Sequence, residues 1–402
     1  MSRIHTTHVG SLPRPAELLE ANARLASGEL PAADFQAILV DATAEVIGRQ
    51  KDIGIDVVND GEYGHIMTQT VDYGAWWFYS FSRFGGLEIA SGDDHLGFAP
   101  PVAADGIQLA SFTQRRDWTA FADAYRDPAS GIHVANQKVV AFPTITGELT
   151  YIGQDEVARD VEATLAALKA NGLSASDGFI AAVSPGSAAR IANTYYANEV
   201  EVLDACAAAL HEEYKAITDA GLTVQIDDPS VAEAWDQFVP EPSVEDYRKW
   251  VQLRIDAANK ALEGIPPELV RFHVCWGSWH GPHTTDIAFK DIVDLVLQVN
   301  AGAYTFEAAN ARHAHEWRVW EDVKLPEGKK IIPGVVSHST NVVEHPELVA
   351  ERIENFARLV GPENVVASTD CGLGGRVYPS IAWAKLEALA EGAAIASKRL
   401  FG

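Results

Sequence analysis

Apolar residues along most of the chain follow two alternating spacings, one typical of amphipathic helices and the other of buried strands. Residues 34–51 carry a helical stripe with a period near 3.6, formed by Phe35, Ile38, Leu39, Ala42, Val46 and Ile47. Short apolar runs follow such stripes, and each run stops at a turn residue or a polar side chain, as buried strands do. The alternation predicts an α/β fold with a mainly parallel sheet.

The pattern predicts eight main helices, over residues 16–30, 34–51, 155–170, 197–220, 243–263, 289–300, 345–360 and 381–399. Ser243 is the expected N-cap of the helix that follows it. Eight strands are expected to end near Ser11, Glu62, Pro143, Asp227, Cys275, Glu307, His338 and Cys371. Strands that mostly alternate with helices indicate a (β/α)₈ TIM barrel, which we expect as a single domain over residues 1–402; a doubly wound sheet is the alternative.

Polar residues mark almost every predicted strand end. Seven of the eight ends carry a Ser, a carboxylate, a His or a Cys, and the exception is Pro143. In such barrels the chemistry takes place at the carboxyl ends of the strands. The barrel hypothesis therefore brings these scattered side chains together in one mouth.

Residues 63–135 interrupt the alternation after the second strand. The first part of this stretch is rich in aromatic residues, namely Tyr63, Tyr73, Trp76, Trp77, Phe78, Tyr79, Phe81 and Phe84. The stretch has no periodic core of its own, so we expect an excursion over the barrel mouth and not a separate domain. It acts either as a functional lid or as packing for the excursion or a subunit interface, and the pattern leaves these alternatives open.

Composition and net charge exclude some kinds of binding partner. Hydrophobic residues make up 47% and charged residues 22% of the 402 residues, as in soluble globular proteins. A net charge of -25 argues against nucleic acid and anionic membranes as partners. The start of the chain lacks the apolar region of a signal peptide, and no apolar run approaches the roughly 18 residues of a membrane span. We therefore expect a cytoplasmic protein.

The three cysteines are too few for a disulfide framework and indicate a reducing compartment. Cys206 falls in a helical pattern and is expected to be a small core residue. His273 and Cys275 are two apart on a predicted strand, so their side chains point to the same face. Alone, such a pair on an apolar strand more often consists of core residues than of metal ligands.

Two further strand ends supply Glu307 and Cys371, which completes a set of one imidazole, two thiols and one carboxylate. Zinc accepts such ligands at about 2.0–2.3 Å. Because the four residues are dispersed over three strand ends, we expect a reactive zinc site that takes up a thiol substrate, with the zinc holding the sulfur as a thiolate.

Other strand ends suggest how an amino-acid substrate would be held. Glu62 and Asp227 suit an ammonium group, and Ser11 could bind a carboxylate through its hydroxyl and backbone N–H. His338 is a candidate general acid with an ordinary pKa of about 6.5. Each residue could instead have a purely structural role: Glu62 in a surface ion pair, Asp227 as a loop cap and Ser11 as a turn residue.

Several motifs together resemble the catalytic domain of cobalamin-independent methionine synthase. They are His8-Val-Gly-Ser-Leu-Pro13, Gly54-Ile-Asp-Val-Val-Asn-Asp-Gly-Glu62, Val224-Gln-Ile-Asp-Asp-Pro229, the His273-x-Cys275 pair, Thr305-Phe-Glu307, Pro333-Gly-Val-Val-Ser-His338 and Asp370-Cys-Gly-Leu373. The resemblance implies a zinc site of His273, Cys275, Glu307 and Cys371. It also implies homocysteine contacts from Ser11, Glu62 and Asp227, proton donation by His338, and a folate-side contact from Glu233.

The sequence departs from that family on the methyl-donor side. The family's Trp after the third strand has no match in residues 142–149, and Phe112-Thr-Gln-Arg-Arg-Asp117 has no clear folate motif. The sequence also shows no additional amino-terminal barrel like that of the long enzymes. The acceptor side thus resembles the family, whereas the donor side differs, with Trp76 and Trp77 as candidate donor contacts.

We expect zinc-dependent methyl transfer to a small-molecule thiol, homocysteine giving methionine, with the methyl donor left open. One alternative is the related chemistry of epoxyalkane:coenzyme M transferase-like enzymes, in which a thiol on zinc opens an epoxide or another alkyl electrophile. Another alternative is a non-catalytic zinc or thiol-binding scaffold. The oligomeric state, including a homo-oligomer, is left open.

Overall fold

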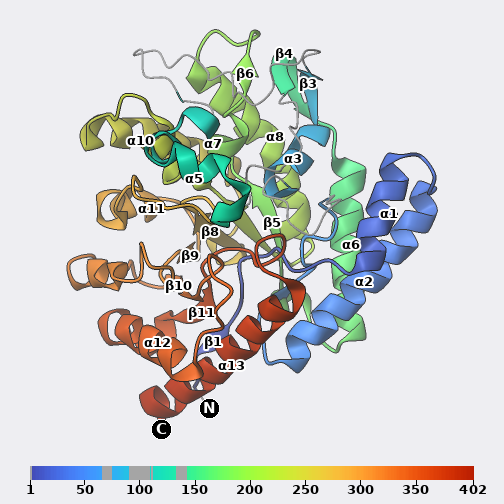
Figure 1. Ribbon diagram of the computed structural model, residues 1–402. Coiled ribbons are helices and arrows are strands. Elements are labelled where there is room, and N and C mark those ends of the chain that lie inside the picture. The colour runs from blue at the N-terminus through green and yellow to red at the C-terminus, as the bar shows by residue number, and fades with distance from the viewer. Residues whose placement is uncertain (1, 66–74, 90–108, 110–111, 133–142) are drawn as a thin grey trace.

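A computed structural model of the chain describes residues 2–65, 75–89, 109, 112–132 and 143–402. Its centre is a sheet of eight strands in the spatial order β1-β11-β10-β9-β8-β7-β5-β2 (Figure 1). Every neighbouring pair in this sheet is parallel. The strands are β1 (His5–Thr6), β2 (Val58–Asn59), β5 (Gly178–Val183), β7 (Thr223–Asp227), β8 (Val270–Val274), β9 (Ala303–Phe306), β10 (Lys330–Val336) and β11 (Val366–Thr369).

Backbone hydrogen bonds join the two edge strands and close the sheet. The N–H groups of Asp56 and Val57, just before β2, donate to the carbonyl oxygen of Thr6 in β1 at 3.1 and 3.0 Å. The Leu12 N–H donates to the Gly61 carbonyl at 3.1 Å. The predicted barrel is therefore confirmed, with its seam between β1 and β2.

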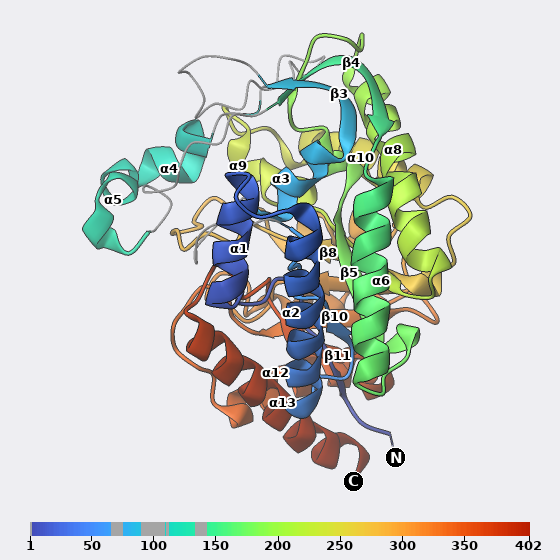
Figure 2. The same cartoon turned by 90° about the vertical axis from the view of Figure 1, so that its right-hand side faces the viewer.

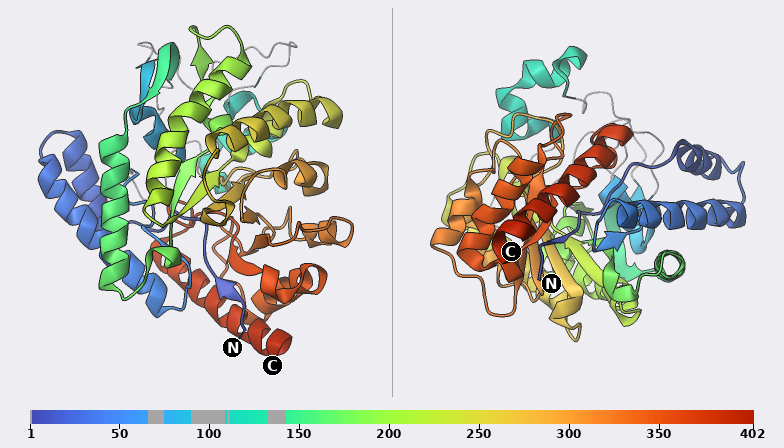
Figure 3. Two further views of the ribbon diagram at one scale, coloured as in Figure 1. Left: turned by 180° about the vertical axis from the view of Figure 1, so that it is seen from behind. Right: turned by 90° about the horizontal axis from the view of Figure 1, so that it is seen from below.

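Helices surround this sheet on all sides in the views of Figures 1 and 3. The longer ones are α1 (Ala16–Ala26), α2 (Ala32–Asp52), α6 (Gln154–Ala170), α8 (Glu199–Asp219), α10 (Val244–Ala261), α12 (Pro346–Val360) and α13 (Pro379–Phe401). Each coincides with a predicted helix, and Ser243 caps α10 by accepting from the Asp246 N–H at 3.1 Å. Cys206 is buried in α8, as predicted for a core residue.

The third barrel strand is not the predicted one. Residues 138–142 lie outside the described residues, and Pro143 begins β4 (Pro143–Tyr151) in a separate three-stranded sheet with β3 (Phe84–Ile89) and β6 (Ala192–Asn193). The barrel uses β5 instead, a continuous apolar run whose six residues are all buried between β2 and β7. A run buried on both faces has no alternation, which is why the pattern did not single it out.

The predicted helix over residues 289–300 is also wrong in extent. It breaks into a 3₁₀ turn, Phe289–Asp291, and the short α11 (Val293–Val296). Ile292 between them has non-helical dihedrals, φ −130° and ψ −12°, so the hydrogen-bond ladder is interrupted there.

The excursion after β2 is described only in part. Its described elements are α3 (Ala75–Ser82), β3, α4 (Arg116–Ala120) and α5 (Ala122–Arg126), and Figure 2 shows α4 and α5 standing out beside the barrel near α9 (Ala234–Gln237). Trp118, Tyr125 and Ile132 of this part form a small apolar cluster with Trp279. That the whole of residues 63–135 belongs to one domain with the barrel stays a prediction. No helix within the described residues has both the length and the apolar character needed to cross a membrane.

A buried ion-pair network fastens the small sheet to the barrel helices. Arg83, at the start of β3, contacts Asp160 of α6 at 2.5 Å and Glu213 of α8 at 3.2 Å. The hydroxyls of Tyr79 and Tyr151 also donate to Glu213, at 3.2 and 2.7 Å. The Arg83 side chain is only 5% exposed, so its charge depends on these two carboxylates.

We expect Arg83→Met to lower the free energy of unfolding by about 3–5 kcal/mol, because it removes the buried cation shared by Glu213 and Asp160, of which Asp160 retains the partly exposed Arg159 at 3.4 Å. Urea unfolding followed by circular dichroism would measure the change. Arg358→Met is the matched control, since the Arg358 side chain is 64% exposed and pairs with Glu354 on the same helix, α12. The control should cost about 0.5 kcal/mol or less. Equal effects of the two substitutions would contradict a role for the buried network.

Candidate metal and thiol site

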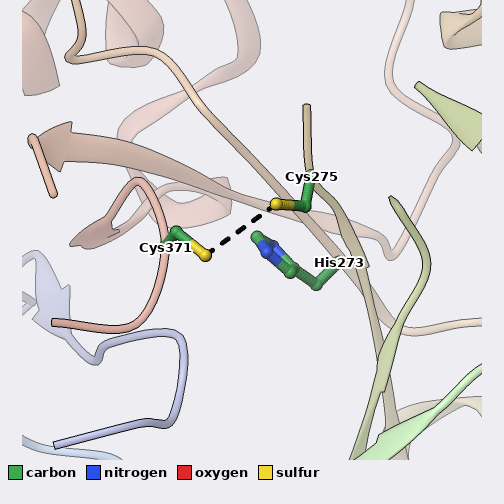
Figure 4. A group of neighbouring side chains, drawn as sticks. All are labelled: His273, Cys275 and Cys371. Carbon is green, nitrogen blue, oxygen red and sulfur yellow. Dashed lines mark hydrogen bonds between the residues drawn. The ribbon is translucent and has the colours of Figure 1, made fainter. Parts of the chain in front are cut away.

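Three of the predicted ligands converge at the carboxyl ends of β8 and β11. His273 lies in β8, Cys275 follows it, and Cys371 follows β11. One ligand atom from each lies within 4.8 Å of the other two, and the two sulfur atoms are 3.9 Å apart. Figure 4 shows both sulfur atoms and the imidazole pointing toward one another. The sulfur separation is far longer than the roughly 2.05 Å of a disulfide, so both thiols are free.

The donor set fits a zinc ion. Both ring nitrogens of His273 are buried and lack a hydrogen-bond partner within the described part of the chain, which is costly unless a cation or another group binds there. The hydrogen bond from Cys275, with smaller contributions from His273 and His338, holds the pKa of Cys371 well below its usual range. That same bond, together with burial, raises the pKa of Cys275. The site thus offers one imidazole and two thiols, one of which ionises readily. Zinc prefers such ligands.

Glu307 lies beside these three residues but not within the same compact group. Its carboxylate instead lies within 4.8 Å of His338 and Asp370. One oxygen accepts from the Trp276 N–H at 2.9 Å and the other from the Asn310 amide at 2.7 Å. Burial, followed by the charges of Asp370 and Cys371, raises the pKa of Glu307 to about 8. Its use as a fourth ligand stays a prediction.

Asp370 is a site residue that the sequence reasoning missed. Its carboxylate accepts from three successive N–H groups, those of Ala308, Ala309 and Asn310, at 2.7, 2.7 and 2.8 Å. Burial raises the pKa of Asp370 to about 6 although these hydrogen bonds favour the charged form. The contact ties the end of β11 to the end of β9. An acidic residue directly after the buried strand β11 was the signal that could have indicated it.

His338 follows β10 and is fully enclosed, with its Nδ1 lacking a hydrogen-bond partner within the described chain. Burial lowers the pKa of His338 to about 3, and the nearby His280, Arg376 and His283 act in the same direction. The expected pKa of about 6.5 is therefore wrong, because the sequence does not reveal how completely the ring is removed from water. The resting imidazole is neutral at pH 7.

The predicted amino-acid contacts also reach this mouth. Glu62 lies in the left-handed region (φ 58°) and packs against Gly10, where a Cβ would lie 2.3 Å from a Glu62 carboxylate oxygen. Burial, with the charges of Asp60 and Cys371, raises the pKa of Glu62 to about 8. Burial and the charges of Glu62 and Cys371 likewise raise the pKa of Asp227. The structure thus brings two carboxyl groups and a thiol into one electrostatic environment.

Ser11 is half-buried in the turn after β1. Its hydroxyl accepts from Arg14 at 3.2 Å, and its carbonyl accepts from the N–H groups of Leu373 and Gly374 at 2.9 and 2.8 Å. These bonds attach the Ser11 turn to the loop that carries Cys371. Ser11 therefore lies beside the same mouth as the thiols.

The donor-side residues are linked by two buried arginines that the sequence reasoning did not identify. One oxygen of Glu233 accepts from Arg115 at 2.6 Å and the other from Arg190 at 2.7 Å. Burial opposes ionisation, but the two guanidinium charges outweigh it and lower the pKa of Glu233. Arg190 lies 5.5 Å from the ring of Trp77, which stacks on the half-buried Trp76. Both oxygens of Glu233 are therefore already engaged.

Comparison with known proteins supplies relatives for this arrangement. The family model described as "Cobalamin-independent synthase, Catalytic domain" matches residues 4–77 and 136–394. A methionine synthase of Thermococcus kodakarensis is 22% identical over 399 residues, covering 98% of this chain and 94% of the relative. A 5-methyltetrahydropteroyltriglutamate–homocysteine methyltransferase of Xylella fastidiosa is 23% identical over 373 residues, covering 92% of this chain and 40% of that longer protein.

The solved structure of a B12-independent methionine synthase from Shewanella sp. W3-18-1, in complex with selenomethionine, has the same fold. It aligns over 99% of both chains with a TM-score of 0.69 and 18% sequence identity. The family model covers all eight strands of the barrel, whereas β3 of the small sheet lies in the unmatched residues 78–135. The chain therefore belongs to the cobalamin-independent synthase family, as a form of its catalytic domain.

Proposed function

We propose that this protein is a zinc-dependent methyltransferase that methylates the thiol of homocysteine and yields methionine. The observation that carries the proposal is the convergence of His273, Cys275 and Cys371 beside the buried carboxyl groups of Glu62 and Asp227. Membership of the family and the names of the relatives in Thermococcus and Xylella support the same reaction.

His273, Cys275 and Cys371 would hold the zinc, with Glu307 as the candidate fourth ligand. When bound, zinc would lower the pKa of the substrate's thiol and keep it as a nucleophilic thiolate. Residues around the site orient these ligands through hydrogen bonds. The Gly277 N–H donates to Cys275 at 3.2 Å, and the Trp276 N–H and Asn310 amide orient Glu307.

Glu62 and Asp227 would bind the ammonium group of the amino acid. Two buried carboxyl groups so close together resist ionising, and an ammonium group supplies the missing positive charge. Ser11, in the turn next to Glu62, would bind the substrate's carboxylate. A thiol that bears a sulfonate and no ammonium, such as coenzyme M, would supply no positive charge to this pair and would be repelled by whichever carboxylate is ionised, which argues against the alternative of epoxide opening.

We assign a proton-transfer role to His338. Methyl transfer forms a sulfur–carbon bond and breaks the bond from the methyl group to the donor, whose leaving atom then takes up a proton. A neutral ring can accept the proton released when the substrate's thiol ionises and pass it to that atom. The negative charge of Cys371 already raises the pKa of His338, against the larger effect of burial, and a second thiolate would act in the same direction.

The donor side consists of Glu233, its partners Arg115 and Arg190, and the Trp76–Trp77 pair. Because both Glu233 oxygens are engaged by arginines, a donor that uses this carboxylate would have to displace one of them. This is consistent with a methyl donor that is not folate polyglutamate.

We expect Cys275→Ser and Cys371→Ser each to weaken zinc binding by more than about 100-fold, because changes to outer-shell partners alone cost roughly 10–100-fold. Metal analysis of the purified variants, with zinc-edge absorption spectra before and after adding homocysteine, would measure this. Cys206→Ser is the matched control, since Cys206 is buried in α8. Full zinc retention in either site variant would contradict the ligand assignment.

His338→Asn should keep zinc and homocysteine binding but lower kcat by roughly 10²–10⁴-fold, the usual contribution of a positioned acid–base group. His315→Asn is the control, because His315 is exposed. Single-turnover kinetics with methyltetrahydrofolate and with a simple alkyl donor would separate the chemical step from binding. Normal turnover of His338→Asn with both donors would rule out the proton-transfer role.

Methionine tests the carboxyl pair without a thiol. At pH 7 a Glu62 with a pKa of about 8 is mostly protonated, and a bound ammonium favours the carboxylate, so binding should release a proton. Affinity should therefore rise between pH 6 and pH 8, by up to about tenfold per pH unit. Calorimetry in buffers of different ionisation enthalpy would count the protons. Glu62→Gln should remove the share of the release that comes from Glu62, whereas Glu20→Gln, on the exposed face of α1, should preserve the whole release. Equal proton release from wild type and Glu62→Gln would contradict the assignment.

A further inference from the structure

The family model leaves residues 78–135 unmatched, and part of that segment packs against the site. The described residues 112–132 contain α4 and α5, which lie together beside the barrel in Figure 2. Trp118, Tyr125 and Ile132 of this part enclose Trp279 in an apolar cluster. Trp279 belongs to the loop that directly follows Cys275. A segment outside the family pattern thus contacts the loop of a proposed metal ligand.

Asp117 is the main polar contact between this segment and the loop. Its side chain is fully buried and accepts hydrogen bonds from the N–H groups of His283 and Thr284 at 3.3 and 2.9 Å. It also accepts from the Thr284 hydroxyl at 2.9 Å and from the Tyr125 hydroxyl at 2.8 Å. The Asp117 N–H donates to Asp236, just inside α9, at 2.9 Å. One carboxylate therefore binds both its own segment and the far end of the loop.

Trp279 extends this contact toward the sulfur. Its indole N–H donates to the Tyr125 hydroxyl at 2.7 Å, and the Arg115 guanidinium lies 4.3 Å from its ring. The ring covers Gly277 so closely that a Cβ there would lie 1.8 Å from a Trp279 ring carbon, and Gly277 has a positive φ of 93°. The Gly277 N–H in turn donates to the Cys275 sulfur at 3.2 Å.

The opposite side of the loop is held independently. The guanidinium of Arg376, which follows Cys371, donates to the Ser278 hydroxyl at 2.6 Å. The stretch from Gly277 to Trp279 is thus held between the loop after β11 and residues 112–132. Removing one of the two contacts leaves the other in place, so the stretch can loosen without the barrel unfolding.

We propose that residues 112–132 are a positioning element of the site, in which Asp117 and Tyr125 hold Trp279 and so direct the Gly277 N–H at the Cys275 sulfur. The inference rests on the proposed function only in taking Cys275 as a metal ligand. Asp117, Tyr125 and Trp279 are positioning residues, because they act through Gly277 and touch neither substrate nor metal.

Hydrogen–deuterium exchange of the full-length, metal-free protein tests this directly. Tyr125→Phe removes only the hydroxyl that joins Trp279 to Asp117, and Asp117→Asn removes the buried charge. In both variants we expect the amides of residues 276–280 to exchange roughly tenfold faster than in wild type, because they lose part of a buried hydrogen-bonded contact. Exchange in α13 should be unchanged.

Matched controls are Tyr195→Phe, on an exposed tyrosine, and Asp127→Asn, on an exposed aspartate of the same segment. Neither should change exchange in residues 276–280. A second measurement is titration with Co²⁺ alone, whose thiolate charge-transfer absorption reports sulfur ligation. Affinity for Co²⁺ should fall roughly tenfold in Tyr125→Phe and Asp117→Asn, as expected when support of a ligand is lost, and not in the controls.

The outcomes separate this inference from the proposed function. If wild type binds no metal, the proposed function fails, whereas faster exchange in residues 276–280 still supports the positioning role. If wild type binds metal but neither variant changes exchange there, the positioning role is overturned and the metal site stands. Faster exchange spread equally over α13 would also overturn it, since that indicates general destabilisation. Should Asp117→Asn fail to fold, Tyr125→Phe alone decides.

Discussion

The Asp370 carboxylate, bound to three successive N–H groups after Glu307, is the contact on which the geometry of the site depends. Asp370 directly precedes Cys371, and the three N–H groups directly follow Glu307. The spacing between the two loops is therefore set by one buried side chain. Charge-assisted hydrogen bonds of this kind are about twice as strong as neutral ones. Without the Asp370 contact, the loops after β9 and β11 would no longer be joined by these three hydrogen bonds.

A second constraint is the concentration of acidic groups in the mouth. Glu62, Asp227, Glu307 and Asp370 are all buried, and burial raises the pKa of each. Carboxyl groups that are buried and influence one another's charge favour a bound cation. The proposed function supplies two, a metal ion beside the sulfur atoms and an ammonium group beside Glu62 and Asp227. The electrostatics of the mouth and the chemistry of the proposed substrates are thus consistent.

Sequence patterns predicted the barrel and the convergence at its mouth because strand ends in a closed parallel barrel share one face. His273, Cys275 and Cys371 could be grouped by this rule alone, before any contact was known. The third strand could not be identified, since β5 is apolar throughout and the nearby run at Pro143 has a similar composition. The sequence did not identify Arg115, Arg190 or Asp117 as site residues. Their contacts join segments far apart in the chain, and the spacing of residues within one segment cannot predict such contacts. The environment of His338 was misjudged for the same reason, since burial is a property of the whole fold.

The seam of the barrel has a consequence for how the molecule responds to a ligand. β1 and β2 have two residues each, and they meet through a few hydrogen bonds around Thr6 and Leu12. Ser11 and Glu62 lie just beyond these strands, whereas Asp227 ends β7 and Cys275 follows β8, two longer strands that are paired along their length. A small molecule held by both groups would span the seam between β1 and β2. Part of its binding free energy would then stabilise the closed barrel. Ligand binding would therefore also strengthen the join between the first and last strands of the sheet.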